Sequence, residues 1–94
     1  MTIKVKNGYI KLEKLKYSGW YLESIVVEEG CRNKGVGKRL MERALKKCVP
    51  PIYLLATSEL GGDTDKLIDF YKSFGFQKIR DRNDLPYNYN MALY

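Results

Sequence analysis

An apolar run, a glycine-rich basic turn and a helical pattern follow one another within residues 20–48. The run "SIVV" stops at two glutamates, and glycines then occupy positions 30, 35 and 37. From residue 36 the apolar residues recur at helical spacing and share one face: Val36, Leu40, Met41, Ala44, Leu45 and Cys48. Pro50-Pro51 ends this helix, and "IYLLAT", residues 52–57, is apolar on both faces, as in a buried parallel strand. The order strand, helix, parallel strand predicts a right-handed βαβ unit.

The flanking segments extend this unit into a mixed sheet. "TIKVKNGYIKLEKLK" alternates around Asn7-Gly8, which predicts a hairpin whose two central turn residues have positive φ. Downstream, Asp63 or Thr64 can cap a second helix with the stripe Leu67, Ile68, Tyr71 and Phe74, and Gly75 fits its end. "FQKIRDR" and "YNYNMALY" read as strands joined by the turn "DLPYN". We expect one α/β (α+β) domain over residues 1–94, with a mixed central sheet, an N-terminal antiparallel hairpin, a βαβ core with two helices and a C-terminal strand pair.

Charge and composition narrow the class of protein. The net charge is +6, and residues 1–20 alone carry five lysines against one glutamate. This excess around the glycine turn would suit an anionic ligand, either nucleic acid or a phosphorylated small molecule, although charge alone is explained first by solubility. No apolar run reaches the ~18 residues of a membrane span, and the N-terminus has no signal-peptide pattern. Cys31 and Cys48 are therefore expected to be free thiols in a cytoplasmic protein, and we predict no metal site.

The position of the turn predicts a phosphate or pyrophosphate site. The first N–H groups of a helix lack partners and favour negative charge, and glycines let the ligand approach the backbone. A P-loop is disfavoured, because Val36 and Gly37 replace its lysine and its Ser or Thr. The match to a dinucleotide-binding fingerprint is also poor, since "GVGKRL" lacks the third glycine.

The segment Arg32-Asn33-Lys34-Gly35-Val36-Gly37 after an apolar strand resembles the Arg/Gln-x-x-Gly-x-Gly/Ala motif of the GCN5-related N-acetyltransferases, the GNAT family. "LIDFYKSFGF" resembles the second signature of that family, so the likeness covers residues 20–94. The resemblance implies acetyl-CoA as co-substrate and splayed central strands. It implies contacts to acetyl-CoA from Ile25, Val26, Val27, Arg32, Asn33, Lys34, Gly35, Val36, Gly37, Lys38, Arg39, Thr64, Phe70 and Phe74.

The same resemblance assigns the chemistry. Tyr71, in Phe70-Tyr71-x-x-x-Gly75-Phe76, would protonate the coenzyme A sulfur, although periodicity alone makes it a core aromatic. Glu23 would act as the base, directly or through water, although as a strand residue it reads equally well as an outward-facing glutamate. Tyr21 is the alternative base, and the backbone N–H groups around Val26 and Val27 would hold the oxyanion. Thr64 stands where many members carry asparagine, which puts that pantetheine contact in doubt.

The front of the chain departs from the family, which usually begins with one more strand and two helices. Only about 20 residues precede the central strand here, as in small phage-type and anti-CRISPR acetyltransferases. We therefore expect an open acceptor side that suits a protein lysine or another exposed amine, or that a homodimer partner covers. Two alternatives stay open: a non-catalytic acetyl-CoA-binding module, and, less favoured, a small basic nucleic-acid-binding domain.

Overall fold

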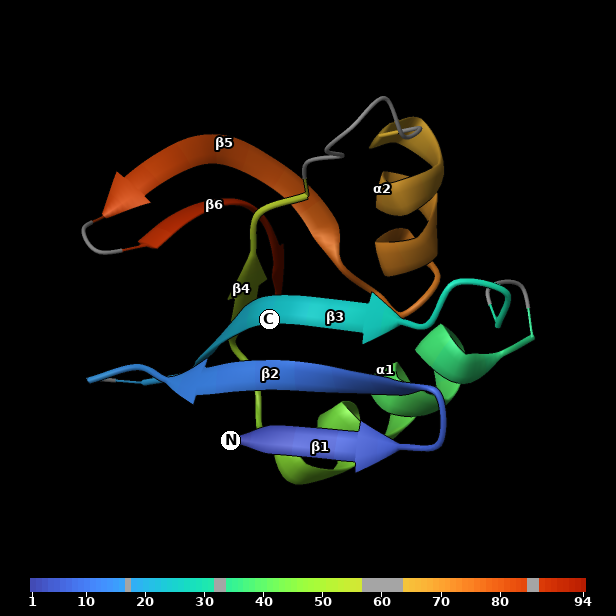
Figure 1. Cartoon of the computed structure of the whole chain (residues 1–94). Coiled ribbons are helices and arrows are strands. Elements are labelled where there is room, and N and C mark those ends of the chain that lie inside the picture. The colour runs from blue at the N-terminus through green and yellow to red at the C-terminus, as the bar shows by residue number, and fades with distance from the viewer. Residues whose placement is uncertain (17, 32–33, 57–63, 85–86) are drawn as a thin grey trace.

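The computed structural model describes residues 1–16, 18–31, 34–56, 64–84 and 87–94, with the side chains of 81–84 and 87 left out of the description. The described residues form a six-stranded sheet and two helices (Figure 1). In chain order the elements are β1 (Thr2–Val5), β2 (Gly8–Lys14), β3 (Trp20–Val27), α1 (Val36–Lys47), β4 (Ile52–Leu54), α2 (Thr64–Lys72), β5 (Gln77–Asp84) and β6 (Tyr87–Leu93).

The strands lie in the order β1-β2-β3-β4-β6-β5. β3 and β4 pair in parallel and flank the middle of the sheet, and the other neighbouring strands pair antiparallel. The predicted fold class is confirmed: the hairpin, the strand–helix–parallel strand unit, both helices and the C-terminal strand pair are all present.

The N-terminal hairpin forms as expected, but its turn lies one residue earlier than predicted. Val5 pairs with Gly8, so the two turn residues are Lys6 and Asn7. Asn7 has φ 74°, whereas Gly8 has no positive φ. A Cβ on Gly8 would lie 2.6 Å from the carbonyl oxygen of Val26 and 3.0 Å from Cγ1 of Val36. Gly8 therefore serves the close approach of β3 and α1 rather than the turn.

One hydrophobic core joins the sheet to both helices. The predicted face of α1 is buried at Val36, Leu40, Met41 and Ala44, and Cys48 follows it into the core. Figure 1 shows α1 behind β1 and β2, and its residues also contact β3. The largest fully buried side chains belong to Ile10, Leu12, Leu40, Met41, Ile52, Leu54, Met91 and Cys48. Both cysteines are free thiols, as expected.

α2 ends where the sequence predicts. Gly75 has φ 99° and donates its N–H to the carbonyl of Lys72, while Phe76 donates to the carbonyl of Tyr71. These two bonds are the Schellman pattern, which requires a residue that tolerates a left-handed backbone. Asp63, one of the two predicted caps, lies outside the described residues, as does part of the predicted turn at 84–88.

The other surface of β1–β3 carries no helix among the described residues. Its side chains are those of Thr2, Lys4, Tyr9, Lys11, Ser24 and Val26, and we call this surface the helix-free face. All of them except the half-buried Ser24 are exposed. The two-residue turn joins β1 to β2 directly, so no element from that connection covers the face. Of the helices described, neither has the length and apolarity needed to cross a bilayer.

Candidate active site

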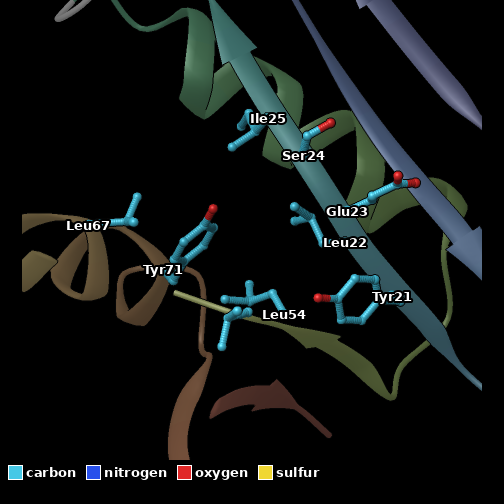
Figure 2. Close-up of a pocket in the computed structure, with 9 residues that line it drawn as sticks. Tyr21, Leu22, Glu23, Ser24, Ile25, Leu54, Leu67 and Tyr71 are labelled. Carbon is cyan, nitrogen blue, oxygen red and sulfur yellow. The ribbon is translucent and has the colours of Figure 1, made fainter. Parts of the chain in front are cut away.

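The parallel pair β3–β4 separates after three residue pairs, and a cleft opens at the fork. Pairing covers Trp20–Leu22 and Ile52–Leu54, whereas β3 continues to Val27. The cleft has a volume of about 420 Å³ and is lined by Tyr21, Leu22, Glu23, Ser24, Ile25, Leu54, Leu55, Leu67 and Tyr71 (Figure 2). The expected burial of residues 52–57 on both faces is wrong at Leu55, which is exposed because the chain leaves the sheet there, whereas Ala56 is buried; residue 57 lies outside the described residues.

The hydrogen-bond alternation of β3 determines which of its N–H groups face the fork. Glu28 donates its N–H to the carbonyl of Asn7 on the β2 side. In an antiparallel pair, bonded positions alternate with non-bonded ones. Val26, opposite Tyr9, is then bonded toward β2, and the N–H groups of Ile25 and Val27 turn toward the fork. The ladder thus favours Ile25 and Val27, rather than the predicted Val26 and Val27, as donors to a ligand.

A β-bulge in β3 places Glu23. Lys11 pairs with Ser24 and Leu12 pairs with Leu22, which leaves Glu23 without an opposite residue. Such a bulge re-aims side chains locally. Oε2 of Glu23 lies 3.6 Å from Nζ of Lys11, a residue of the helix-free face. Figure 2 shows the carboxylate pointing away from Tyr71, so the two candidate catalytic groups lie on opposite sides of β3.

Tyr71 reaches the cleft from α2, on the core side of the sheet. Its side chain is 5% exposed and its ring makes edge contacts with Phe70 and Phe76. Burial raises the pKa of Tyr71 to about 12, so the phenol stays protonated at neutral pH. In Figure 2 its hydroxyl points into the cleft toward β3. The predicted role as proton donor and the predicted core packing are compatible, because the ring is buried and the hydroxyl faces the cavity.

Tyr21, the alternative base, has another contact. Its hydroxyl donates to the carbonyl oxygen of Asn88 at 2.8 Å. The pKa of Tyr21 is raised, mainly by burial and also by the charge of Glu23. Both features favour a protonated, anchored phenol over a base.

The predicted pyrophosphate loop leads into an uncapped helix. Gly35 is the N-cap of α1 with φ 80°, no side chain of the described residues caps this end, and the first turn has no acidic residue. Arg39 donates the first helical N–H, to Gly35, so the earlier N–H groups of the turn are available to an anion. Lys34, Lys38 and Arg39 are exposed here. Arg32 and Asn33 lie outside the described residues.

The two motif glycines have different roles. A Cβ on Gly35 would meet no atom within 4 Å, so this glycine is required by its positive φ. A Cβ on Gly37 would lie 3.4 Å from Cζ of Phe70, so its lack of a side chain brings α1 against α2. Phe74 stacks edge-on with Phe70, and Thr64 is half-buried at the start of α2. The side chain of Val36, by contrast, faces the core, so only the backbone of this residue is left to contact a ligand.

Several residues of the site were not predicted from the sequence. Ser24, Leu54, Leu55 and Leu67 line the cleft without belonging to a motif. Asn90 fixes the chain after β4, because its side-chain amide accepts from the N–H of Ala56 at 2.8 Å and donates to its carbonyl at 3.2 Å. An asparagine inside an apolar strand was the available signal. No cluster of metal-ligating side chains occurs among the described residues.

Comparisons with known proteins agree with this geometry. The anti-CRISPR protein AcrVA5 has the same fold, with a TM-score of 0.71, 23% identity and coverage of 98% of this chain and 94% of its own. A GNAT-family acetyltransferase of Staphylococcus aureus Mu50 gives a TM-score of 0.70 at 26% identity, over 92% of this chain and 57% of its own. Naa50 of Arabidopsis thaliana, in complex with the bisubstrate analogue CoA-Ac-MVNAL, gives a TM-score of 0.61 at 26% identity, over 90% of this chain and 62% of its own.

By sequence, curated proteins yield no match. The family model "Acetyltransferase (GNAT) domain", however, matches residues 3–78, which is most of the sequence. On the strength of that match, the chain belongs to the GNAT family of acetyltransferases.

Proposed function

We propose that this protein transfers the acetyl group of acetyl-CoA directly to a primary amine. The observation that carries the proposal is the fork between β3 and β4. Past the last pair of β3 and β4 it presents strand N–H groups without a backbone partner among the described residues, together with a buried phenol and a carboxylate around one cleft. At the far end of β3 the chain leads into the uncapped start of α1.

The donor would bind along the fork. The first-turn N–H groups of α1 would receive the pyrophosphate, since a helix start favours negative charge. The N–H groups of Ile25 and Val27 would bond the pantetheine arm and the thioester carbonyl. The apolar side chains of Leu22, Leu54 and Leu67 would surround the acetyl group and exclude water.

The chemical step needs one base and one acid. Glu23, directly or through a water molecule, takes a proton from the acceptor ammonium. The amine nitrogen then bonds to the thioester carbon, and strand N–H groups stabilise the oxyanion. As the oxyanion collapses, the C–S bond breaks and Tyr71 donates its proton to the departing thiolate. The nitrogen loses its second proton to solvent, Glu23 releases the first proton to solvent, and solvent returns one proton to Tyr71. The products are the acetylated amine, coenzyme A and one proton.

The positions of Glu23 and Tyr71 on opposite sides of β3 support this sequence of events. The thioester would lie on the core side with Tyr71, and the amine would approach from the helix-free face, where Glu23 is 42% exposed. Because that face is open, an amine carried on a polypeptide can reach the cleft. The Naa50 complex contains a peptide joined to coenzyme A, and the proposal extends peptide acetylation to this chain.

The test is turnover. The purified protein is mixed with labelled acetyl-CoA and lysine peptides, polyamines or amino acids, and both free thiol and labelled product are measured. Acetylated amine formed in step with thiol release is expected. Tight acetyl-CoA binding without any acetylated amine would contradict the proposal and leave a non-catalytic binding module. Binding of RNA in preference to acetyl-CoA would instead support the nucleic-acid alternative.

A further inference from the structure

A second hollow, separate from the cleft, lies on the helix-free face. It has a volume of about 320 Å³, beside the turn of the N-terminal hairpin. Its lining residues come from β1, β2, β3 and the two adjoining turns: Lys4, Val5, Asn7, Gly8, Tyr9, Val26 and Glu28. Acetyl transfer as described above makes no use of the side chains in this hollow.

The floor of the hollow is apolar and uncovered. Tyr9 and Val26 are directly opposite each other on β2 and β3. They are 38% and 39% exposed, which is high for large apolar side chains in the middle of paired strands. Placing another apolar group against them would remove this surface from water, which is favourable.

The rim of the hollow carries both signs of charge. Lys4 is the cross-strand partner of Tyr9 on β1, and Glu28 follows β3 on the other side. Both are exposed. A lysine can donate to a peptide carbonyl and a carboxylate can accept from a peptide N–H. An apolar floor between a donor and an acceptor therefore matches a side chain flanked by its own backbone.

The hollow and the cleft share strand β3. Val26 lies two residues beyond Ser24 and three beyond Glu23, and both of these residues line the cleft. At about 3.4 Å per residue this is roughly 7–10 Å. An extended peptide with its reactive amine at Glu23 would bring a side chain two or three positions away over the Tyr9–Val26 floor.

We propose that this hollow binds a large apolar side chain of a polypeptide acceptor, two or three residues from the lysine that is acetylated. The inference rests on the proposed acetyl transfer and names its substrate class. Tyr9 is then a specificity-determining residue, and free polyamines or amino acids, which lack such a side chain, are poor acceptors.

Other occupants fit less well. A nucleic-acid phosphate would meet the carboxylate of Glu28 on the rim of the hollow and that of Glu23 beside Lys11. A second copy of the chain would present the same hollow, and two concave surfaces leave a void between them. A side chain of an extended peptide fills the hollow and satisfies the rim at once.

The experiment compares acceptor peptides. N-terminally blocked ten-residue peptides carry one lysine in a Gly/Ser/Thr background, with Gly, Leu or Phe placed two or three positions before or after it. Initial rates of thiol release give kcat and KM for the parent protein and for three variants. Tyr9→Thr removes the ring but keeps a strand-favouring residue, Tyr9→Phe restores the ring, and Tyr94→Ala removes an exposed tyrosine outside the hollow. Circular dichroism and acetyl-CoA affinity verify that each variant is folded.

We expect Leu or Phe at one position to lower KM by about tenfold relative to Gly, the effect of about 1.4 kcal/mol, with kcat little changed. Tyr9→Thr should abolish this preference, while Tyr9→Phe and Tyr94→Ala should retain it. Equal KM values for the Gly, Leu and Phe peptides would overturn the inference, as would a preference that survives Tyr9→Thr.

The remaining outcomes separate this inference from the proposed function. Acetylation of polyamines but of no peptide would overturn the inference alone. So would a concentration-dependent dimer in sedimentation that Tyr9→Thr dissociates. Turnover of no amine at all would overturn the proposed function and this inference with it.

Discussion

Gly37 and Phe70 meet where α1 contacts α2: a Cβ on Gly37 would lie 3.4 Å from Cζ of Phe70. Alanine fits this space with a slight shift of the ring, whereas a longer side chain would push α2 away. Gly37→Ala should therefore change the free energy of unfolding by less than about 1 kcal/mol. Gly37→Leu should lower it by about 1–3 kcal/mol, as overpacking does. Urea denaturation measures both, and equal stability of the two variants would contradict the contact.

Gly35 and Gly30 allow a matched comparison, because φ is 80° and 86° and both would place a Cβ in open space. Alanine at either position should cost about 1–2 kcal/mol through the left-handed backbone. Calorimetry with acetyl-CoA should distinguish them: Gly35→Ala distorts the start of α1 and should weaken binding at least tenfold, by more than Gly30→Ala does. Equal affinities would show that the pyrophosphate does not bind at this helix start.

Tyr71→Phe tests the proton donor while keeping the buried ring. Stability and acetyl-CoA affinity should change little, and kcat should fall by about 10²–10⁴-fold, the usual contribution of a positioned acid. The phenol pKa of about 12 means that no titration of Tyr71 should appear in the rate profile between pH 6 and 9. Full kcat in Tyr71→Phe across that range would reduce Tyr71 to a core aromatic.

The raised pKa of Tyr71 also predicts a stability change in alkali. Burial raises it from 10.0 to about 12, so between these values the folded protein holds a proton that the unfolded chain has lost. The unfolding free energy should therefore fall as pH rises through this window, by up to about 1.4 kcal/mol per unit. Below pH 10 the group should have no effect. Chemical denaturation at pH 9, 10 and 11 should show a larger loss of stability in the parent than in Tyr71→Phe, because the raised pKa of Tyr21 contributes to both proteins.

Glu23→Gln removes the proposed base and keeps the size of the side chain. We expect kcat/KM to fall by about 10²-fold or more, with acetyl-CoA affinity unchanged. The control is Glu13→Gln, an exposed glutamate on β2 outside the cleft. If the two variants have equal rates with the same peptide, another group or bulk water serves as the base.

Periodicity and turn residues predicted most of this fold because the pattern of each element lies within a short stretch of neighbouring residues. The stripe of α1, the stop at Gly75 and the short buried strand after Pro51 are examples. The turn at Lys6–Asn7 was misplaced because Gly8 is needed for the close approach of Val26 and Val36, and both of these residues lie far from Gly8 in the sequence. The bulge at Glu23 was also missed, since it exists only relative to β2. The cleft residue Leu67 and the anchor Asn90 depend likewise on which strands end early, which no local pattern states.

The three pairs from Trp20–Ile52 to Leu22–Leu54 are the strand pairing between two three-stranded halves, β1-β2-β3 and β4-β6-β5. The two halves are thus joined by these three residue pairs, and beyond them one edge of β3 has no strand partner among the described residues. Under the proposed binding mode, acetyl-CoA would form hydrogen bonds with this edge of β3. It would then lie between the two halves as a seventh strand-like element. The coenzyme would then connect the two halves of the sheet as well as donate the acetyl group, and each product release would loosen the sheet at its centre.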